Sequence, residues 1–195
     1  MRVRTYVAAL LALAVGSPAL AQGARLKPGA GSRVVIQGTS NMHKWDCVST
    51  SFTGTAEVPS GTPAEVGKAV TSLAVTIPAR SIDCGNGTMN NNLRKAMKAE
   101  QHPNVTFRLT SYDAAPAGAS GAYNATVTGS LTIAGTERPV ELKATVSPDG
   151  KGGARAEGST EIRTTDYGVP IVRALMGTLK TGERITVVLT IVATR

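Results

Sequence analysis

Three scarcities in this 195-residue sequence limit what the chain can do, and aromatic residues are the first of them. Phe, Tyr and Trp together make up only 4% of the chain. The 21 Lys and Arg residues are scattered and not interleaved with these rings, as they would be in a nucleic-acid interface. The formal charge of +8 therefore does not indicate a nucleic-acid partner. Peripheral contact with an anionic membrane surface fits this charge better and is our hypothesis.

Recognisable catalytic motifs are the second scarcity. The sequence contains no Gly-x-Ser-x-Gly, no His-Glu-x-x-His and no Gly-rich phosphate loop. It has only 13 carboxylates, and most of them stand alone among polar residues. We therefore expect a protein that is not an enzyme, with no catalytic residues.

Metal-ligating side chains are the third scarcity, since the chain has two His and two Cys. By count, His43, Cys47, Cys84 and His102 match a Cys2His2 zinc set. If the segment 42–58 is extended, however, His43 and Cys47 lie about 13 Å apart, at ~3.3 Å per residue. One ion cannot bind both, so we expect no metal site.

The first 21 residues have the pattern of a secretory signal peptide. Arg2 and Arg4 precede an apolar run that ends in Ala19-Leu20-Ala21, a typical cleavage pattern. No later apolar run approaches the length of a membrane span. We expect cleavage near Ala21 and a periplasmic location, or secretion beyond it.

The two cysteines both follow this segment. An oxidising compartment and an even number of cysteines predict a disulfide between Cys47 and Cys84. Two free buried thiols are the alternative. A disulfide would close a loop of about 38 residues, and the chain-entropy relation makes it worth roughly 4 kcal/mol.

The remainder divides into residues 22–32, expected to be a disordered N-terminus, and one domain over 33–195. The domain alternates apolar and polar residues, with turn signals such as Pro-Asp-Gly at 148–150. This pattern predicts an all-β antiparallel sheet, either a barrel or a sandwich. The expected strands cover residues 33–40, 42–58, 68–79, 104–113, 122–135, 137–147, 155–168 and 183–195.

One segment, residues 81–107, departs from the strand pattern. Met89, Leu93, Ala96 and Met97 recur at helical spacing and predict a short helix over 88–99. The turn at 86–88 supplies its start, and Pro103 marks its end. This helix either covers the core or acts as a lid whose Leu and Met side chains touch a ligand.

Four segments together resemble the YceI-like family of exported proteins. They are GTSNMHKWDC (38–47), VTIPARSIDCGNGTMNNNLRKAMKAEQHPNVTFRLTS (75–111), VTGSLTIAGTERPVELKATV (127–146) and STEIRTTDYGVP (159–170). Their order and spacing match over residues 33 to about 193. The resemblance implies an eight-stranded antiparallel, lipocalin-like β-barrel with one short helix inserted between strands.

It also implies non-enzymatic binding of a polyisoprenoid, an isoprenoid quinone or a similar amphipathic lipid in the barrel, for transport or storage. No other cofactor is expected. The alternative is a structural, stress-related or redox-accessory barrel that acts with a membrane partner. Oligomeric state and protein partners are not predicted. The apolar faces of the strands, with Trp45 and two helix residues, form the expected lipid-binding wall: Trp45, Leu73, Val75, Ile77, Leu93, Met97, Val105, Phe107, Leu109, Leu131, Ile133, Leu142, Val187 and Leu189.

Overall fold

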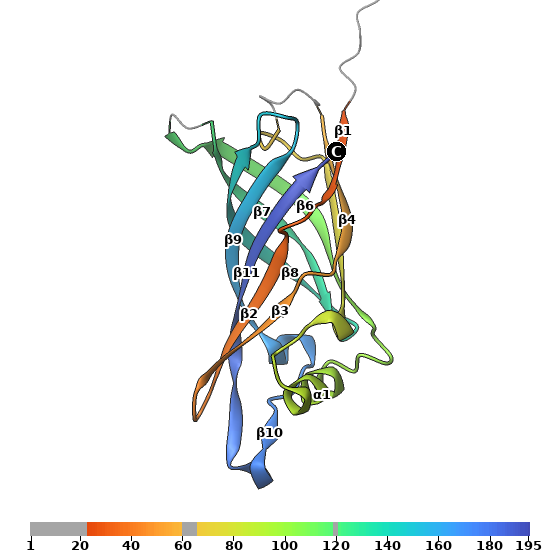
Figure 1. Ribbon diagram of the computed structural model, residues 1–195, viewed down its shortest axis with the longest axis vertical. Coiled ribbons are helices and arrows are strands. Elements are labelled where there is room, and N and C mark those ends of the chain that lie inside the picture. Colours follow the sequence, from red (N-terminus) through yellow and green to blue (C-terminus); the bar gives the residue numbers. More distant parts are fainter. Residues whose placement is uncertain (1–22, 60–65, 119–120) are drawn as a thin grey trace, which may run out of the picture.

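The computed structural model describes residues 23–59, 66–118 and 121–195, and strands dominate the described chain (Figure 1). The strands are β1 (Ala24–Pro28), β2 (Arg33–Ser40), β3 (Lys44–Ser49), β4 (Thr53–Val58), β5 (Ser72–Pro78), β6 (Asn104–Pro116), β7 (Tyr123–Ile133), β8 (Thr136–Pro148), β9 (Ala154–Arg163), β10 (Arg173–Ala174) and β11 (Leu179–Thr194). The helix α1 covers Gly87–Ala96, and short 3-10 helices cover η1 (Ala79–Ser81), η3 (Thr164–Tyr167) and η4 (Leu175–Gly177). The predicted signal peptide lies outside the described residues.

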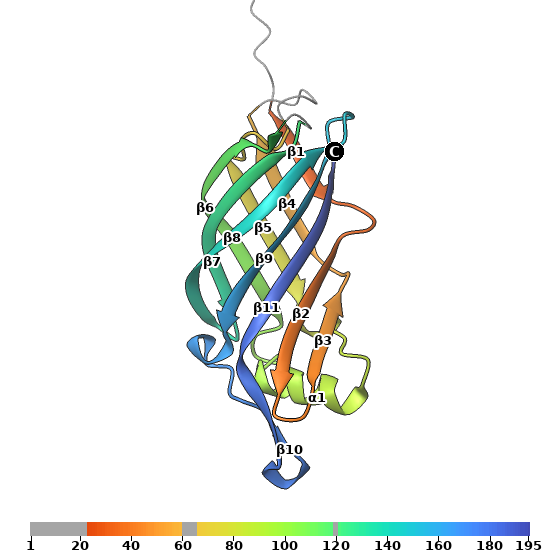
Figure 2. The ribbon, with the colours of Figure 1, turned by 90° about the vertical axis from the view of Figure 1, so that its left-hand side faces the viewer.

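The strands form a closed antiparallel barrel. The order β1-β4-β5-β6-β7-β8-β9-β11 returns to β1 because β1 pairs with both β4 and β11. Strand β2 follows β1 and pairs with the other part of β11. Strand β3 pairs with β2 and lies farther from the C-terminus than β4 does (Figure 2). Strands β1 and β2 together therefore take the place of one interrupted barrel strand, and β3 and β4 take the place of another. Counted in this way, the barrel has eight strands. This confirms the fold that the resemblance implied and decides between barrel and sandwich.

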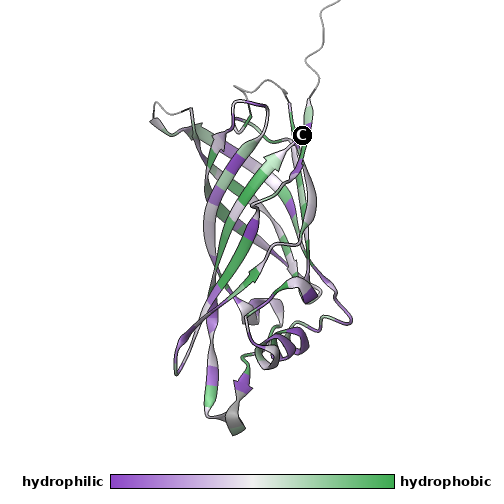
Figure 3. Ribbon diagram, viewed as in Figure 1, coloured by the Kyte–Doolittle hydropathy of each residue, from purple (hydrophilic) through white to green (hydrophobic). Residues whose placement is uncertain are grey.

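The alternating sequence pattern explains why these segments form the wall. Successive side chains of a strand point to opposite faces, so one face lines the interior and the other meets water. Polar and apolar residues accordingly alternate along the strands (Figure 3). The outer face also carries exposed ion pairs, such as Arg25 with Glu57 and Arg184 with Glu161. Exposed pairs of this kind add little stability.

Strand β1 corrects the prediction that residues 22–32 are disordered. Leu26, buried to 3% exposure, lies in the apolar interior, and Ala24, Arg25 and Leu26 pair with β4. The sequence pattern did not predict this strand because Pro28 and the glycines after it interrupt the alternation of apolar and polar residues. Its pairing also depends mainly on backbone groups.

Two further elements differ from the predicted strands. The expected strand 42–58 is broken into β3 and β4 around residues 50–52. The expected strand 155–168 ends early, at Arg163, where the chain turns through η3, and β10 then forms a hairpin with β11 that the pattern did not predict. This hairpin projects from the end of the barrel where α1 lies, which we call the lower end (Figure 1). The C-terminus marks the upper end.

The start of α1 is fixed by a small network of hydrogen bonds. The Asp83 carboxylate accepts bonds from the Gly85 amide and the Asn90 side chain. The side-chain oxygen of Asn90, Oδ1, in turn accepts from the Cys84 amide. Asn86 is the N-cap, and its side chain accepts from the Met89 amide. This network explains why Asp, Gly and Asn stand together just before the helix.

The end of α1 comes earlier than the predicted residue 99. The helix ends at Ala96, and Lys98 then adopts a left-handed conformation with φ of 50°. The Ala99 amide donates to the Arg94 carbonyl and the Lys98 amide to the Lys95 carbonyl, which is the Schellman pattern of helix termination. The predicted apolar stripe is confirmed, since Met89, Leu93, Ala96 and Met97 all pack into one apolar cluster. In the described part of the chain no helix is both long and apolar enough to cross a bilayer.

The segment before α1 is fastened to β3 in two ways. Val48 and Asp83 exchange two backbone hydrogen bonds, of 2.7 and 2.9 Å. A disulfide joins Cys47 to Cys84, as predicted from the cysteine count. Together they hold the start of α1 against the edge of β3, which closes the lower end of the barrel on that side.

We predict that the double substitution Cys47→Ala with Cys84→Ala lowers the free energy of unfolding by about 4 kcal/mol, because the unfolded chain regains the entropy of an open loop. Denaturant unfolding would measure this. A reductant should lower the stability of the native chain to that of the variant and leave the variant unchanged. Equal stability of the oxidised chain and the variant would contradict the prediction.

A second prediction concerns acid stability. The Asn90 side chain, then the Gly85 amide and the charge of Arg94, hold the pKa of Asp83 below its ordinary value of 3.8. The ionised carboxylate therefore stabilises the folded chain above pH 3.8, and this stabilisation is lost as pH falls through the lowered pKa. The free energy of unfolding of Asp83→Asn should therefore fall less than that of the native chain between neutral pH and about pH 3.

The matched control is Asp149, an exposed carboxylate in the β8–β9 turn whose pKa is lowered by the Lys151 and Gly153 amides. Asp149→Asn should also reduce the acid-dependent loss of global stability. Only Asp83→Asn should change the hydrogen exchange of the first turn of α1. If the acid dependence of Asp83→Asn equals that of the native chain, the Asp83 carboxylate of the native chain is unpaired in solution.

Candidate functional site: an apolar cavity in the barrel

The barrel encloses a cavity of about 320 Å³ that extends from its lower to its upper end. Side chains from every strand of the ring, from β2 and β3 and from α1 line it, and nearly all of the lining is apolar. Among the described residues, this lining contains no Asp, Glu, His or Cys. The site therefore offers an apolar surface and few polar groups.

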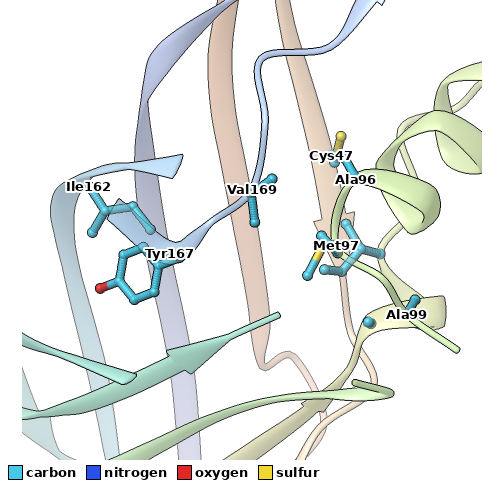
Figure 4. Close-up of a cluster of buried hydrophobic side chains, with 9 residues drawn as sticks. Cys47, Ala96, Met97, Ala99, Ile162, Tyr167 and Val169 are labelled. Carbon is cyan, nitrogen blue, oxygen red and sulfur yellow. The ribbon is translucent and has the colours of Figure 1, made fainter. Parts of the chain in front are cut away.

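Two apolar clusters bracket the cavity. The lower cluster joins α1 to the barrel and consists of Cys47, Ala79, Ile82, Ala96, Met97, Ala99, Ile162, Tyr167 and Val169 (Figure 4). The upper cluster consists of Leu26, Val58, Val66, Ala125, Val127, Val146 and Ala154. Helix α1 thus covers the lower end of the cavity, as expected of the predicted helix.

The structure brings the predicted wall residues together, with one exception. The lining includes Trp45 from β3, Leu73, Val75 and Ile77 from β5, Leu93 and Met97 at α1, Val105 and Phe107 from β6, Leu131 and Ile133 from β7, Leu142 from β8, and Val187 and Leu189 from β11. Their contact with a lipid remains a prediction.

Leu109 is the exception. It packs beside the upper cluster and does not line the cavity. The pairing of β6 with β7 shifts between Leu109 and Ser111, so one extra residue is inserted in β6. After this bulge the alternation is reversed, and Tyr112 lines the cavity. The sequence pattern 104–113 contains no signal for this change.

Many inward side chains are only partly buried although they face the interior. Leu131, Val187 and Leu189 are only half-buried, because no side chain from the opposite wall fills the space against them. Inward apolar residues of a packed core would be buried almost completely. The apolar wall of this barrel is therefore unpacked along part of its length.

Two aromatic rings help to leave this space open. The ring of Trp45 lies over Gly38 on the neighbouring strand, where a Cβ atom would come within 2.2 Å of the indole. The ring of Phe107 lies over Gly129, where a Cβ atom would come within 2.4 Å. The indole Nε1 also donates to the Thr39 carbonyl at 3.0 Å. Both rings are thus held against the wall by a glycine on an adjacent strand.

Some polar groups at the cavity form hydrogen bonds within the protein. The Tyr112 hydroxyl donates to the Gly67 carbonyl, and the Thr160 hydroxyl donates to the Glu141 carbonyl at 2.8 Å. Burial, with a smaller contribution from Tyr123, raises the pKa of Tyr112 to about 12. Burial likewise raises the pKa of Tyr167. Both phenols are therefore uncharged at neutral pH.

Charged residues are almost absent from the lining. Lys27, exposed on β1, borders the cavity near the upper end. The basic residues of the helix segment, Arg94, Lys95 and Lys98, do not line the cavity. Arg94 donates to the Arg80 carbonyl, while Lys95 and Lys98 are exposed. The helix therefore turns its apolar stripe to the cavity and its charges away from it.

Sequence reasoning missed several lining residues, among them Ile82, Tyr112, Tyr167 and Val169. Three of these stand in the segments that carried the family resemblance, and that was the available signal. No group of three or more His, Cys, Asp or Glu side chains in the described part of the chain could hold a metal ion.

Solved structures share this fold. Burkholderia cenocepacia BcnA is 24% identical, with a TM-score of 0.67 over 85% of this chain and 98% of that one. A polyisoprenoid binding domain from Saccharophagus degradans is 12% identical, with a TM-score of 0.66 over 88% of this chain and 98% of that one. The Campylobacter jejuni YCEI protein is 20% identical, with a TM-score of 0.58 over 80% of this chain and 85% of that one.

Sequence relatives point the same way. UPF0312 proteins from Pseudomonas aeruginosa and Ectopseudomonas mendocina are 31% and 30% identical over 104 residues, half of this chain. The chain spans about half the length of these curated relatives. The family model of the YceI-like domain matches residues 27–193, which include α1 and the barrel except for the first three residues of β1 and the last residue of β11. The chain therefore belongs to the YceI-like family.

Proposed function

We propose that this protein binds one amphipathic lipid, a polyisoprenoid or an isoprenoid quinone, with its apolar tail inside the barrel. It acts as a carrier or store and performs no reaction on the lipid. The observation that carries the proposal is the unpacked apolar wall of the cavity. An apolar tail would cover side chains such as Leu131, Val187 and Leu189 and remove their surface from water.

The energetics favour a long apolar ligand. Each Å² of apolar surface that leaves water contributes ~25 cal/mol, before the cost of ordering the ligand. The cavity reaches from the lower cluster to the upper cluster, so a chain-like molecule fits it better than a compact one. The similarity to a Saccharophagus degradans domain described as polyisoprenoid-binding supports an isoprenoid as the chain.

The chemistry of the lining supports binding without catalysis. General acid–base and nucleophilic catalysis need a titratable or nucleophilic group within reach of the reacting atoms. The described lining has uncharged phenols, the hydroxyls of a few Ser and Thr residues, and Lys27 near its upper end. The periplasm is our proposed location, because the signal-peptide pattern and the Cys47–Cys84 disulfide both suit an oxidising compartment.

Filling the cavity should reduce lipid binding. Ala144 lines the cavity, so Ala144→Phe would occupy space that the tail needs. We expect about a 5- to 150-fold loss of affinity for a fluorescent farnesyl derivative, since overpacking typically costs 1–3 kcal/mol. Fluorescence titration of the purified chain would measure it.

The matched control is Thr145→Phe, which adds the same ring to the next residue of β8, where the side chain is exposed on the outer face. It should bind the probe as the native chain does. Both variants need an unchanged circular dichroism spectrum for the comparison to hold. Equal affinities of the native chain and folded Ala144→Phe would place the ligand outside the cavity.

The natural cargo can be identified directly. Native mass spectrometry of protein isolated from a periplasmic fraction should show a retained adduct that organic extraction releases as a polyprenyl chain or quinone. The cysteine-paired protein should also be lighter than its reduced form by the mass of two hydrogen atoms. An empty barrel that also refuses a panel of added polyprenols and quinones would overturn the proposed function and leave the fold unaffected.

A further inference from the structure

The positive charge of the chain is concentrated in three segments. After residue 21 the sequence has 19 basic residues, which is 21 less Arg2 and Arg4, and 13 acidic ones. Residues 40–45, 87–98 and 172–182 contain six of these basic residues and no Asp or Glu. The rest of this part of the chain is balanced, with 13 basic and 13 acidic residues. The six residues are Lys44, Arg94, Lys95, Lys98, Arg173 and Lys180.

These three segments meet at the lower end of the barrel. Residues 40–45 form the β2–β3 hairpin tip, residues 87–98 contain α1, and residues 172–182 form the β10–β11 hairpin. Figures 1 and 2 show all three at the end opposite to the C-terminus. We call the surface formed by these three segments the basic end.

Hydrogen bonds hold the two hairpins of the basic end side by side. The Asn41 amide donates to the Lys180 carbonyl at 3.0 Å, and the Lys180 amide donates to the Asn41 side chain at 2.9 Å. The Asn41 side chain also donates to the Thr178 carbonyl at 2.8 Å. The two tips are therefore one fixed feature of the structure.

Each tip presents a methionine to solvent. Met42 is 63% exposed and Met176 is 109% exposed, and they are the exposed large hydrophobic residues of the described chain. Adjacent basic side chains are exposed as well, and in the described part of the chain Lys44, Arg173 and Lys180 form no ion pair. Four arginines of the strand wall, in contrast, pair with glutamates, as Arg163 does with Glu183.

Exposed methionines at the hairpin tips, among basic side chains without ion pairs in the described chain, suit the surface of an anionic lipid bilayer. Anionic lipid headgroups attract Lys and Arg, and the acyl boundary beneath them accepts exposed apolar side chains. We propose that the basic end docks on the surface of an anionic lipid bilayer, with Met42 and Met176 entering its interface. This inference goes beyond the proposed function, because docking does not require a lipid in the cavity.

Vesicle flotation tests the proposal. The native chain should bind vesicles of phosphatidylglycerol mixed with phosphatidylcholine and float poorly with vesicles of phosphatidylcholine alone. Lys44→Glu with Lys180→Glu should weaken binding to the anionic vesicles at least about tenfold at low salt. Met42→Ser with Met176→Ser should weaken it too, and this loss should persist in high salt, where attraction between charges is screened.

The matched control is Lys143→Glu with Lys151→Glu, which makes the same change in net charge on β8 and in the β8–β9 turn, away from the basic end. Its binding to the anionic vesicles should weaken less than about threefold. An equal loss in the two charge variants would overturn the proposal, because net charge alone would then explain binding. No binding of the native chain to anionic vesicles would also overturn it and would favour a protein partner for this surface.

Titration with the farnesyl probe in the absence of vesicles separates the two proposals. The basic-end variants should bind the probe as the native chain does, since none of the substituted residues lines the cavity. A native chain that floats with vesicles and refuses the probe would refute the proposed function only. A chain that binds the probe and does not float would refute docking only.

Discussion

Closure of the backbone hydrogen-bond ring is the constraint on which the rest of this structure depends. Strand β1 supplies it, with three residue pairs to β4 and two to β11. Because each strand of the ring then has a partner on both sides, the wall is held by its own hydrogen bonds and exposes no long edge. Side chains need not meet across the interior, which is how an apolar cavity persists inside a folded chain of this size.

Alternation in the sequence predicted the direction of the inward side chains, since in a strand such as β5 it depends only on the period of the backbone. Strand β1 was not predicted, because Pro28 and the glycines after it interrupt the alternation and the pairing of β1 is made by backbone groups. The bulge after Leu109 was not predicted because one inserted residue reverses the alternation without a residue type that marks it. The open space depends on rings lying over Gly38 and Gly129, and such contacts between strands are invisible in a linear pattern.

An unpacked apolar wall lowers the stability of the empty chain. Atoms that line a void lose the dispersion contacts that a filled core would supply. A ligand that binds only the folded ring restores them and stabilises the protein in proportion to the logarithm of its concentration over its dissociation constant. The two apolar clusters limit this cost, because their side chains are packed where the cavity meets each end of the barrel. Stability and cargo are thus linked through the same side chains.

Helix α1 differs from the wall in what holds it. A ten-residue helix is marginal by itself, and the Asp83 network, the disulfide and the burial of Leu93 and Met97 supply its stability. Its removal from the barrel would break few backbone bonds, whereas parting two wall strands would break a whole ladder. Local opening occurs where it disrupts the fewest such bonds. The lower end beside α1 is therefore held by fewer backbone hydrogen bonds than any seam of the wall, and it is also the end where the six residues of the basic end lie.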